Sequence, residues 1–196
     1  MTSKRITLLN GHPAESSISK QIIETYAQAA RGEGHEVRVL NIHDMDFDMD
    51  YGFGGYKNQK PLEPELEDFL EALEWSEHFV FAAPMWWGGL PAKLKGLIDR
   101  SFLPGRVFDT RVKPGTMPLP MLDGRTARVF LTSDTPGWVF RLFYKDALAW
   151  QIKGQILNFV GFKPARITRF AGASHPKPRQ IEGWLKTVAR LGAKAR

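Results

Sequence analysis

Residues 79–98 read FVFAAPMWWGGLPAKLKGLI, and this stretch changes from an apolar strand to an amphipathic helix. An uninterrupted apolar run that ends at Pro84 is typical of a strand buried on both faces of a parallel sheet. Leu94 and Leu97 then keep helical spacing, and Pro91 suits a first helical position. A buried strand that leads directly into a helix predicts an α/β protein with helices on both faces of a sheet.

Four other apolar runs have the length and composition of strands, and segments with helical periodicity lie between several of them. Ser16 and Ser17 are suitable N-caps for a helix after the first strand, and Gly32 lies past the expected end of that helix. The first, third and fourth runs are apolar enough to be central in a parallel sheet. The predicted strands are Arg5 to Asn10, His35 to Asn41, Phe79 to Pro84, Thr126 to Thr132 and Ala165 to Ala171.

The composition is that of a soluble globular chain and excludes thiol chemistry. The 196 residues are 43% hydrophobic and 24% charged, and no apolar run has the length that a membrane-spanning helix needs. We therefore expect one domain over residues 1–196 that is not embedded in a membrane. The first residues lack the pattern of a secretory signal, so a cytoplasmic location is expected. Because there is no cysteine, redox chemistry would need a bound cofactor.

The charge pattern does not favour nucleic acid or a metal as a ligand. Lys and Arg number 27 against 21 Asp and Glu, but the acids concentrate in residues 44–77 and the bases after residue 163. No nucleic-acid-binding motif accompanies them. The histidines lack metal-ligand spacing, and the acidic run 44–50 has Met49 where a calcium loop needs glycine. We predict no nucleic-acid partner and no metal, and we interpret residues 44–50 as a solvated loop.

The loop after the first strand has the chemistry of a phosphate site. Residues 10–19 read NGHPAESSIS, which supplies a flexible glycine, several hydroxyls and the exposed N–H groups of a helix N-terminus. The loop has neither the G-x-G-x-x-G of a dinucleotide clasp nor the pattern of a P-loop. A second interpretation, in which Ser16 and Ser17 only cap the helix, explains the same residues and stays open.

Two adjacent tryptophans, Trp86 and Trp87, lie at the predicted turn between the third strand and its helix. A turn lies on the surface, where indole rings are costly to leave in water, so a flat aromatic ligand would explain both residues. Gly88 and Gly89 would let the backbone approach such a ring closely. The alternative is a surface loop that closes on its own helix.

Two longer stretches do not fit the simple alternation of strands and helices. Leu103 to Gly124 is rich in Pro, Gly and Arg and indicates a long excursion, which in a compact domain is more often functional than idle. Val139 to Val160 is apolar almost all round, which is more than one buried face needs. We interpret part of this second stretch as a subunit interface, and a helix buried within the monomer is the alternative.

Three groups of residues carry a resemblance to a known family over nearly the whole chain. They are Gly11-His12 with Ser17 and Ser19, then Pro84-Met85-Trp86-Trp87 with Pro91-Ala92-x-Leu94-Lys95-Gly96-x-x-Asp99-Arg100, and Ile156-Leu157-x-Phe159-x-Gly161-Phe162 leading to Gly183-Trp184. The sequence resembles the flavodoxin-fold NAD(P)H:quinone oxidoreductases of the DT-diaphorase type, a group that also includes modulator-of-drug-activity proteins and the ancillary flavoproteins of glutathione-gated potassium efflux systems. The resemblance implies an α/β flavodoxin-like three-layer sandwich, with a five-stranded parallel sheet in the order 2-1-3-4-5.

The resemblance also implies a function and a set of site residues. Members of this family are flavin-dependent NAD(P)H oxidoreductases that pass hydride by a ping-pong mechanism to a quinone or a similar flat acceptor. The flavin phosphate would be held by His12, Ser17, Ile18 and Ser19, and the ring by Pro84, Met85, Trp86, Trp87, Gly88, Ser133, Thr135 and Gly137. The chain departs from the family near the hydride-transfer site, where it has no histidine. Tyr144 is the candidate catalytic proton donor, although packing within an apolar stretch explains it at least as well.

The cofactor and partners follow from the same resemblance. FMN is favoured because no adenosine-binding extension is recognisable, with FAD as the alternative and NAD(P)H as co-substrate. The family implies a homodimer with flavin sites near the interface. A regulatory flavoprotein that binds a partner, such as a cation-efflux transporter, is the alternative function. The choice between NADH and NADPH and the physiological acceptor stay open.

Overall fold

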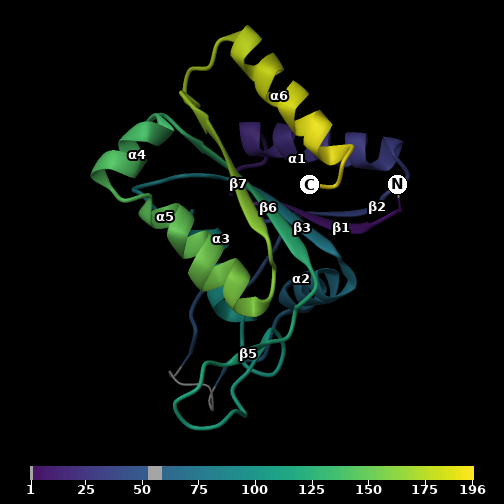
Figure 1. The fold of residues 1–196 in the computed structure, drawn as a ribbon, viewed down its shortest axis with the longest axis vertical. Coiled ribbons are helices and arrows are strands. Elements are labelled where there is room, and N and C mark those ends of the chain that lie inside the picture. The colour runs from purple at the N-terminus through teal and green to yellow at the C-terminus, as the bar shows by residue number, and fades with distance from the viewer. Residues whose placement is uncertain (1, 53–58) are drawn as a thin grey trace.

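The computed structural model describes residues 2–52 and 59–196, which form a parallel sheet covered by helices on both faces (Figure 1). Its five strands lie in the order β2-β1-β3-β6-β7. They are β1 (Arg5–Asn10), β2 (Glu36–Asn41), β3 (His78–Pro84), β6 (Thr126–Ser133) and β7 (Ala165–Ala171). Counted over these strands alone, the order is 2-1-3-4-5. The predicted sheet and its five strands are therefore confirmed, each strand to within one residue at either end.

The central strands are β1, β3 and β6, as the sequence predicts. Their interior residues are buried because helices cover both faces of the sheet. One face forms a core with Tyr26 and Phe130, and the other face forms a core with Phe69, Phe79 and Leu97. All neighbouring strands run parallel, so their carboxyl ends lie at one edge of the sheet.

Helices α1 (Ile18–Gly32) and α6 (Pro178–Gly192) cover one face and pack against each other (Figure 1). Ser17 is the N-cap of α1, and its side-chain oxygen accepts a hydrogen bond from a first-turn N–H at 3.1 Å. The predicted role of Gly32 is wrong, because this residue is still helical. Gly34 instead adopts a left-handed φ of 81°, which glycine tolerates without strain, and turns the chain back toward β2.

Helices α2 (Pro64–Trp75) and α3 (Ala92–Ser101) contact the opposite face. Pro91 is the N-cap of α3 and not its first residue, which shifts the predicted start by one position. Sequence patterning did not single out α2, because the abundant acids of residues 44–77 obscured its apolar stripe. The buried residues of α2 are Leu66, Phe69, Leu70, Ala72 and Leu73.

The apolar stretch Val139 to Val160 divides into two parts that differ in burial. Helix α5 (Ala147–Trp150) continues into a π-helix, η1 (Gln151–Asn158), and both contribute to the core. Their buried residues include Leu148, Ile152 and Leu157. Helix α4 (Gly137–Phe143) has no buried residue, and its exposed apolar side chains are Trp138, Leu142 and Phe143. A helix buried within the monomer therefore describes α5 and η1, whereas α4 carries the exposed apolar surface. Among the described residues, no helix is both long enough and apolar enough to cross a membrane.

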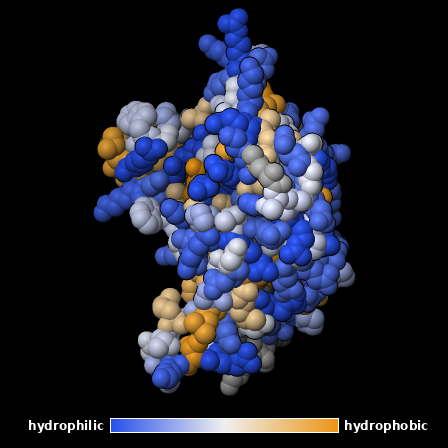
Figure 2. Space-filling model, turned by 45° about the vertical axis from the view of Figure 1, so that its right-hand side comes forward, coloured by the Kyte–Doolittle hydropathy of each residue, from blue (hydrophilic) through white to orange (hydrophobic). Residues whose placement is uncertain are grey.

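The excursion after α3 forms a short antiparallel pair, β4 (Phe108–Asp109) with β5 (Leu119–Pro120). Its exposed apolar residues are Met117, Leu119 and Met121. Figure 2 shows hydrophobic atoms, in orange, at the lower tip where this excursion lies and at the upper left near α4. Apolar side chains are costly to leave in water, so these two regions are candidate contact surfaces.

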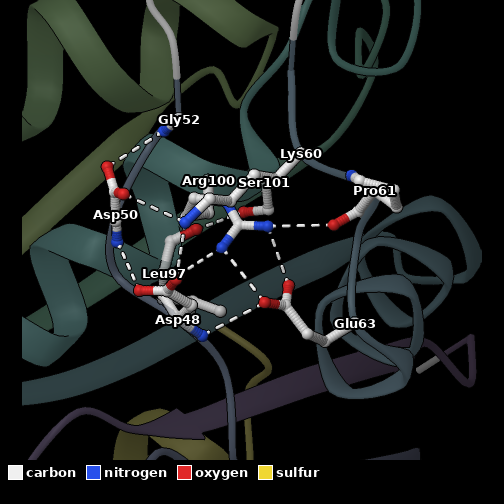
Figure 3. Close-up of polar contacts among 9 residues, drawn as sticks. All are labelled: Asp48, Asp50, Gly52, Lys60, Pro61, Glu63, Leu97, Arg100 and Ser101. Atoms are coloured by element: carbon white, nitrogen blue, oxygen red, sulfur yellow. Dashed lines mark hydrogen bonds and ion pairs between the residues drawn. The ribbon is translucent and has the colours of Figure 1, made fainter.

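Arg100 of α3 fastens the loop that precedes α2 (Figure 3). Its side chain is only 2% exposed and donates hydrogen bonds to the Glu63 carboxylate at 2.8 Å and the Pro61 carbonyl at 3.0 Å. It also donates to the backbone carbonyl of Asp48. Burial raises the pKa of Glu63, but hydrogen bonds from Arg100 and the Asp48 N–H outweigh this and leave the pKa below its usual value. Arg100 is therefore a structural tie between α3 and this loop.

The acidic run 44–50 is partly organised by a single lysine (Figure 3). Lys60 Nζ lies 2.6 Å from a carboxylate oxygen of Asp48 and 3.0 Å from one of Asp50, and both carboxylates are exposed. Hydrogen bonds from Lys60 and from the backbone hold the pKa of each acid below its usual range. The loop is solvated, as predicted, but these contacts give it a defined conformation.

Candidate functional site

Loops from four strands meet at the carboxyl edge of the sheet and enclose a cavity of about 250 Å³. Its walls come from the loops after β1, β3, β6 and β7, which the parallel strands place side by side. The predicted site residues that line it are His12, Ser17, Ile18, Ser19, Pro84, Met85, Trp86 and Ser133. We call it the Ser19 cavity, because the buried hydroxyl of Ser19 decides its chemistry.

The hydroxyl of Ser19 is a buried polar group without a partner among the described residues. The residue is 1% exposed and lies in the first turn of α1, which carries no acidic side chain. A buried hydroxyl is costly unless it is hydrogen-bonded, and a helix N-terminus favours negative charge. The Ser19 cavity therefore suits an anion such as a phosphate. The two interpretations of this loop are compatible, because Ser17 caps the helix and Ser19 is left for a ligand.

His12 stands in the wall of the Ser19 cavity with its tautomer defined by a backbone contact. Its Nδ1 accepts a hydrogen bond from the Ala14 N–H at 3.0 Å, so the proton of the neutral ring lies on Nε2. Burial lowers the pKa of His12. The ring meets that of Trp86 edge-on, with centroids 5.5 Å apart. His12 can therefore donate a hydrogen bond from Nε2 while it is neutral.

A second cavity, of about 620 Å³, adjoins the first and shares Met85, Ser133 and Asp134 with it. We call it the Trp87 cavity. The predicted site residues that line it are Met85, Trp87, Gly88, Ser133, Thr135 and Tyr144. Phe140, Ala147 and Leu148 add an apolar wall. A cavity of this size with apolar walls and a few polar groups suits a flat organic ligand.

The turn that carries both tryptophans has a constrained backbone. The Trp86 N–H donates to the Gly89 carbonyl at 3.0 Å, and the reverse hydrogen bond is 2.8 Å long. Trp87 adopts a φ of 51°, which is uncommon for a residue other than glycine, and Gly88 follows with a φ of 74°. The side chain of Trp87 is fully exposed and therefore does not pack on α3. The alternative of a surface loop that closes on its own helix does not account for this residue. Strained backbone beside an exposed indole is typical of a ligand site.

Tyr144 and Gly137 lie differently with respect to the two cavities. Tyr144 lines the Trp87 cavity, is 63% exposed and has its ring 6.1 Å from that of Phe140. Its hydroxyl makes no hydrogen bond within residues 2–52 and 59–196, so it is free for a ligand. Gly137 lines neither cavity, because it begins α4 and faces Arg169.

Asp134, in the loop after β6, pairs with Ser174, a residue that the sequence reasoning did not assign to the site. The Asp134 carboxylate accepts hydrogen bonds from the Ser174 N–H at 2.7 Å and from its hydroxyl at 2.6 Å. These bonds hold the pKa of Asp134 below its usual range. Asp134 lines both cavities, and Ser174 closes the Ser19 cavity from the loop after β7. Ser174 follows β7, the strand that pairs with β6, and this position is the signal by which sequence reasoning could have assigned Ser174 to the site. The described residues hold no cluster of three His, Cys, Asp or Glu suited to a metal.

Comparison with known proteins gives one family and several distant relatives. The family model described as a flavodoxin-like fold matches residues 4–191, which include every residue that lines the two cavities. The ribosyldihydronicotinamide dehydrogenase (quinone) of Mus musculus is 22% identical over 189 residues, covering 83% of this chain and 79% of that protein. The FMN-dependent NADH:quinone oxidoreductase of Exiguobacterium sp. is 27% identical over 126 residues, covering 55% and 58%. The solved structure of the NAD(P)H:quinone oxidoreductase from Methanothermobacter marburgensis has a TM-score of 0.79 at 21% identity, covering 98% and 96%.

Proposed function

Because the chain belongs to the flavodoxin-like fold family and its relatives are named as quinone oxidoreductases, we propose that it is a flavin-dependent NAD(P)H oxidoreductase that reduces a quinone or a similar flat acceptor. The observation that carries this proposal is the junction of the two cavities. An anion site with an unpaired buried hydroxyl opens directly into an apolar cavity beside two tryptophans. A phosphorylated flavin has the matching charge and shape. NAD(P)H and the acceptor would then occupy the remaining part of the Trp87 cavity in turn, as a ping-pong mechanism requires.

The residues present fit FMN better than FAD. Ser19, the Nε2 of His12 and the N-terminus of α1 would hold the terminal phosphate, and the turn at Trp87 and Gly88 would flank the ring. The Ser19 cavity, of about 250 Å³, has room for a phosphate and part of the ribityl chain. The name of the Exiguobacterium relative also favours FMN. When bound, the flavin supplies the two-electron hydride chemistry that a chain without cysteine lacks.

The chain's own contribution is to position the ligands and exclude water. The Ser133 hydroxyl donates to the Thr135 carbonyl at 2.9 Å, which orders the loop between β6 and α4 at the junction of the cavities. Phe140 and Leu148 line the Trp87 cavity opposite the tryptophan turn. A ring held between these walls would present its reactive face to one flat partner at a time, and such positioning lowers the entropic barrier to transfer.

Reconstitution of the purified protein with FMN tests the proposed function. We expect a flavin absorption spectrum, binding of one FMN per chain, and flavin-dependent oxidation of NADH or NADPH by a soluble quinone. Identification of the released cofactor separates the two flavins, because FAD bound in preference to FMN would refute the choice of FMN alone. A protein that stays colourless with both FMN and FAD would refute the whole proposal.

Tyr144→Phe tests the candidate proton donor in the same assay. If the Tyr144 hydroxyl protonates the acceptor, its removal should lower kcat for quinone reduction about tenfold, less than the usual effect of general acid loss because water reaches this exposed side chain. FMN affinity and the rate of flavin reduction by NAD(P)H should not change. An unchanged kcat would assign Tyr144 to packing against Phe140.

We infer that α4 mediates the homodimer, because its apolar side chains are unburied in a single chain. Trp138, Leu142 and Phe143 are between 59% and 71% exposed and adjoin the Trp87 cavity through Phe140. Leu142→Asp should convert a dimer into a monomer at micromolar concentration, because a carboxylate buried against an apolar partner has no counter-charge. Sedimentation gives the mass. Met117→Asp changes an equally exposed apolar residue on the excursion and is the matched control. A wild-type monomer, or a dimer that Leu142→Asp leaves intact, would contradict this interface.

The regulatory alternative uses the same exposed face of α4. A partner such as a cation-efflux transporter, captured by the wild-type chain and lost in Leu142→Asp, would favour that role over dimerisation. Slow quinone reduction by the fully reconstituted protein would also favour the regulatory role. This alternative and a cytoplasmic location stay predictions.

A further inference from the structure

A basic groove of about 500 Å³ lies along β7, the edge strand of the sheet, and is lined by residues of β6, β7, α5 and η1. Figure 1 shows the green helical segment of α5 and its continuation running beside the β7 arrow. The charged residues that line the groove are Arg128, Lys153, Arg166, Arg169 and Asp146. Four cations thus face one carboxylate, which makes the groove attractive to anions. We call it the β7 groove.

Several cationic groups of the β7 groove lack partners. Arg166 and Lys153 make no hydrogen bond or ion pair with any residue that the structure describes, and both are exposed. Arg169 pairs with Asp146, but its Nε is buried without an acceptor in the described chain. Burial lowers the pKa of Arg128, and repulsion from Arg166 lowers it further. An anion in the groove would relieve this repulsion and satisfy the free donors.

Asp146 lines both the β7 groove and the Trp87 cavity, so the two adjoin at this residue. Ser133 lines the Trp87 cavity and Arg128 lines the groove, and the two residues lie five positions apart on β6. At about 3.3 Å per residue the separation is about 16 Å along the strand. An extended nicotinamide dinucleotide spans a comparable length between its nicotinamide and its adenosine. A ligand whose nicotinamide lies in the Trp87 cavity would therefore reach the groove with its other end.

An exposed tryptophan completes the groove. Trp150, at the end of α5, lines it and is 70% exposed, so its indole face is available for stacking. Aromatic side chains stack favourably on nucleobases. The groove thus combines a stacking surface with unpaired guanidinium and ammonium groups, which are the features that recognise an adenosine carrying a phosphate.

We propose that the β7 groove binds the adenosine end of NADPH, with its 2′-phosphate on Arg166 and Lys153 and its adenine against Trp150. This inference rests on the proposed function, because the nicotinamide must lie over a flavin in the Trp87 cavity. The groove makes NADPH the preferred reductant over NADH, since NADH lacks the 2′-phosphate.

The double variant Lys153→Gln and Arg166→Gln tests this assignment. The KM for NADPH should rise at least about tenfold, because two charge-assisted contacts to phosphate are lost. The KM for NADH, kcat and the FMN affinity should not change. The control is Lys186→Gln with Arg190→Gln, which removes the same two charges from the exposed side of α6. An NADPH preference that survives in the groove variant, or is lost equally in the control, would overturn the proposal.

Direct binding separates this proposal from the proposed function. Calorimetry with 2′,5′-ADP, ADP and inorganic phosphate requires neither flavin nor turnover. We expect the wild-type protein to bind 2′,5′-ADP at least about tenfold more tightly than ADP, and the groove variant to lose this difference. Equal affinity for 2′,5′-ADP and ADP, or binding of inorganic phosphate alone, would refute the NADPH assignment even if the protein proves to be a quinone reductase. Failure of FMN binding with a preserved 2′,5′-ADP preference would refute the proposed function and keep the groove as a nucleotide site.

Discussion

The Ser17→Asp variant should keep its stability and lose its flavin. Asp is as good an N-cap as Ser, and its negative charge is favourable at a helix N-terminus, so the apo-protein should unfold at the same or a higher urea concentration. The same carboxylate would stand in the wall of the Ser19 cavity, where the flavin phosphate is proposed to bind. Two unit charges about 4 Å apart repel by about 4 kcal/mol at an effective dielectric constant of about 20. FMN affinity should therefore fall by at least about a hundredfold.

Two measurements and one control decide the Ser17→Asp prediction. Urea unfolding of the apo-protein measures how the N-cap affects the free energy of unfolding. A titration followed by FMN fluorescence measures the affinity for FMN. Ser17→Asn is the matched control, because Asn caps helices as well as Asp but adds no charge. Unchanged FMN affinity in Ser17→Asp would show that the flavin phosphate does not bind at the N-terminus of α1. Equal loss of affinity in Ser17→Asn would mean that the Ser17 hydroxyl, and not the added charge, controls binding.

The strands and the flavin-facing loops could be predicted because each depends on local sequence. Buried parallel strands are short apolar runs, and five such runs end within one residue of the ends of the five strands. Parallel topology then brings the loops after those strands to one edge, so Ser19 and Trp87 could be assigned to one region without knowledge of their contacts. The flavodoxin-like fold is confirmed by the family match over residues 4–191.

Other features depend on tertiary contacts that sequence spacing does not encode. Helix α2 carries an apolar stripe that the sequence analysis did not single out among its many acids, and packing on the sheet defines its buried side. Asp134 and Ser174 are 40 residues apart, and only the pairing of β6 with β7 brings them together. The division of Val139 to Val160 into an exposed α4 and a buried η1 depends on where the chain turns after Tyr144. Burial of an apolar helix cannot be assigned from composition alone.

Arg100→Met should strongly lower the free energy of unfolding, although Arg100 belongs to one of the motifs that carry the family resemblance. Arg100 lines neither flavin cavity and is instead buried against Glu63, Pro61 and the Asp48 carbonyl (Figure 3). Methionine fills a similar volume but leaves the partly buried Glu63 carboxylate without its cationic partner and the two carbonyls without the Arg100 donors. Removal of one partner from such a pair typically lowers the free energy of unfolding by about 3 kcal/mol or more.

The Arg100→Met prediction separates a structural role from a flavin-binding role. Urea unfolding should show the loss of stability, whereas the folded fraction should bind FMN with unchanged affinity, because no flavin contact is altered. Lys60→Met, which removes an exposed partner of the same Asp48, should change stability much less, since exposed ion pairs contribute little. Adding Glu63→Gln to Arg100→Met should recover part of the loss, because the unpaired carboxylate is then neutral. A stable Arg100→Met protein with weakened FMN binding would reverse the assignment and place Arg100 in the flavin site.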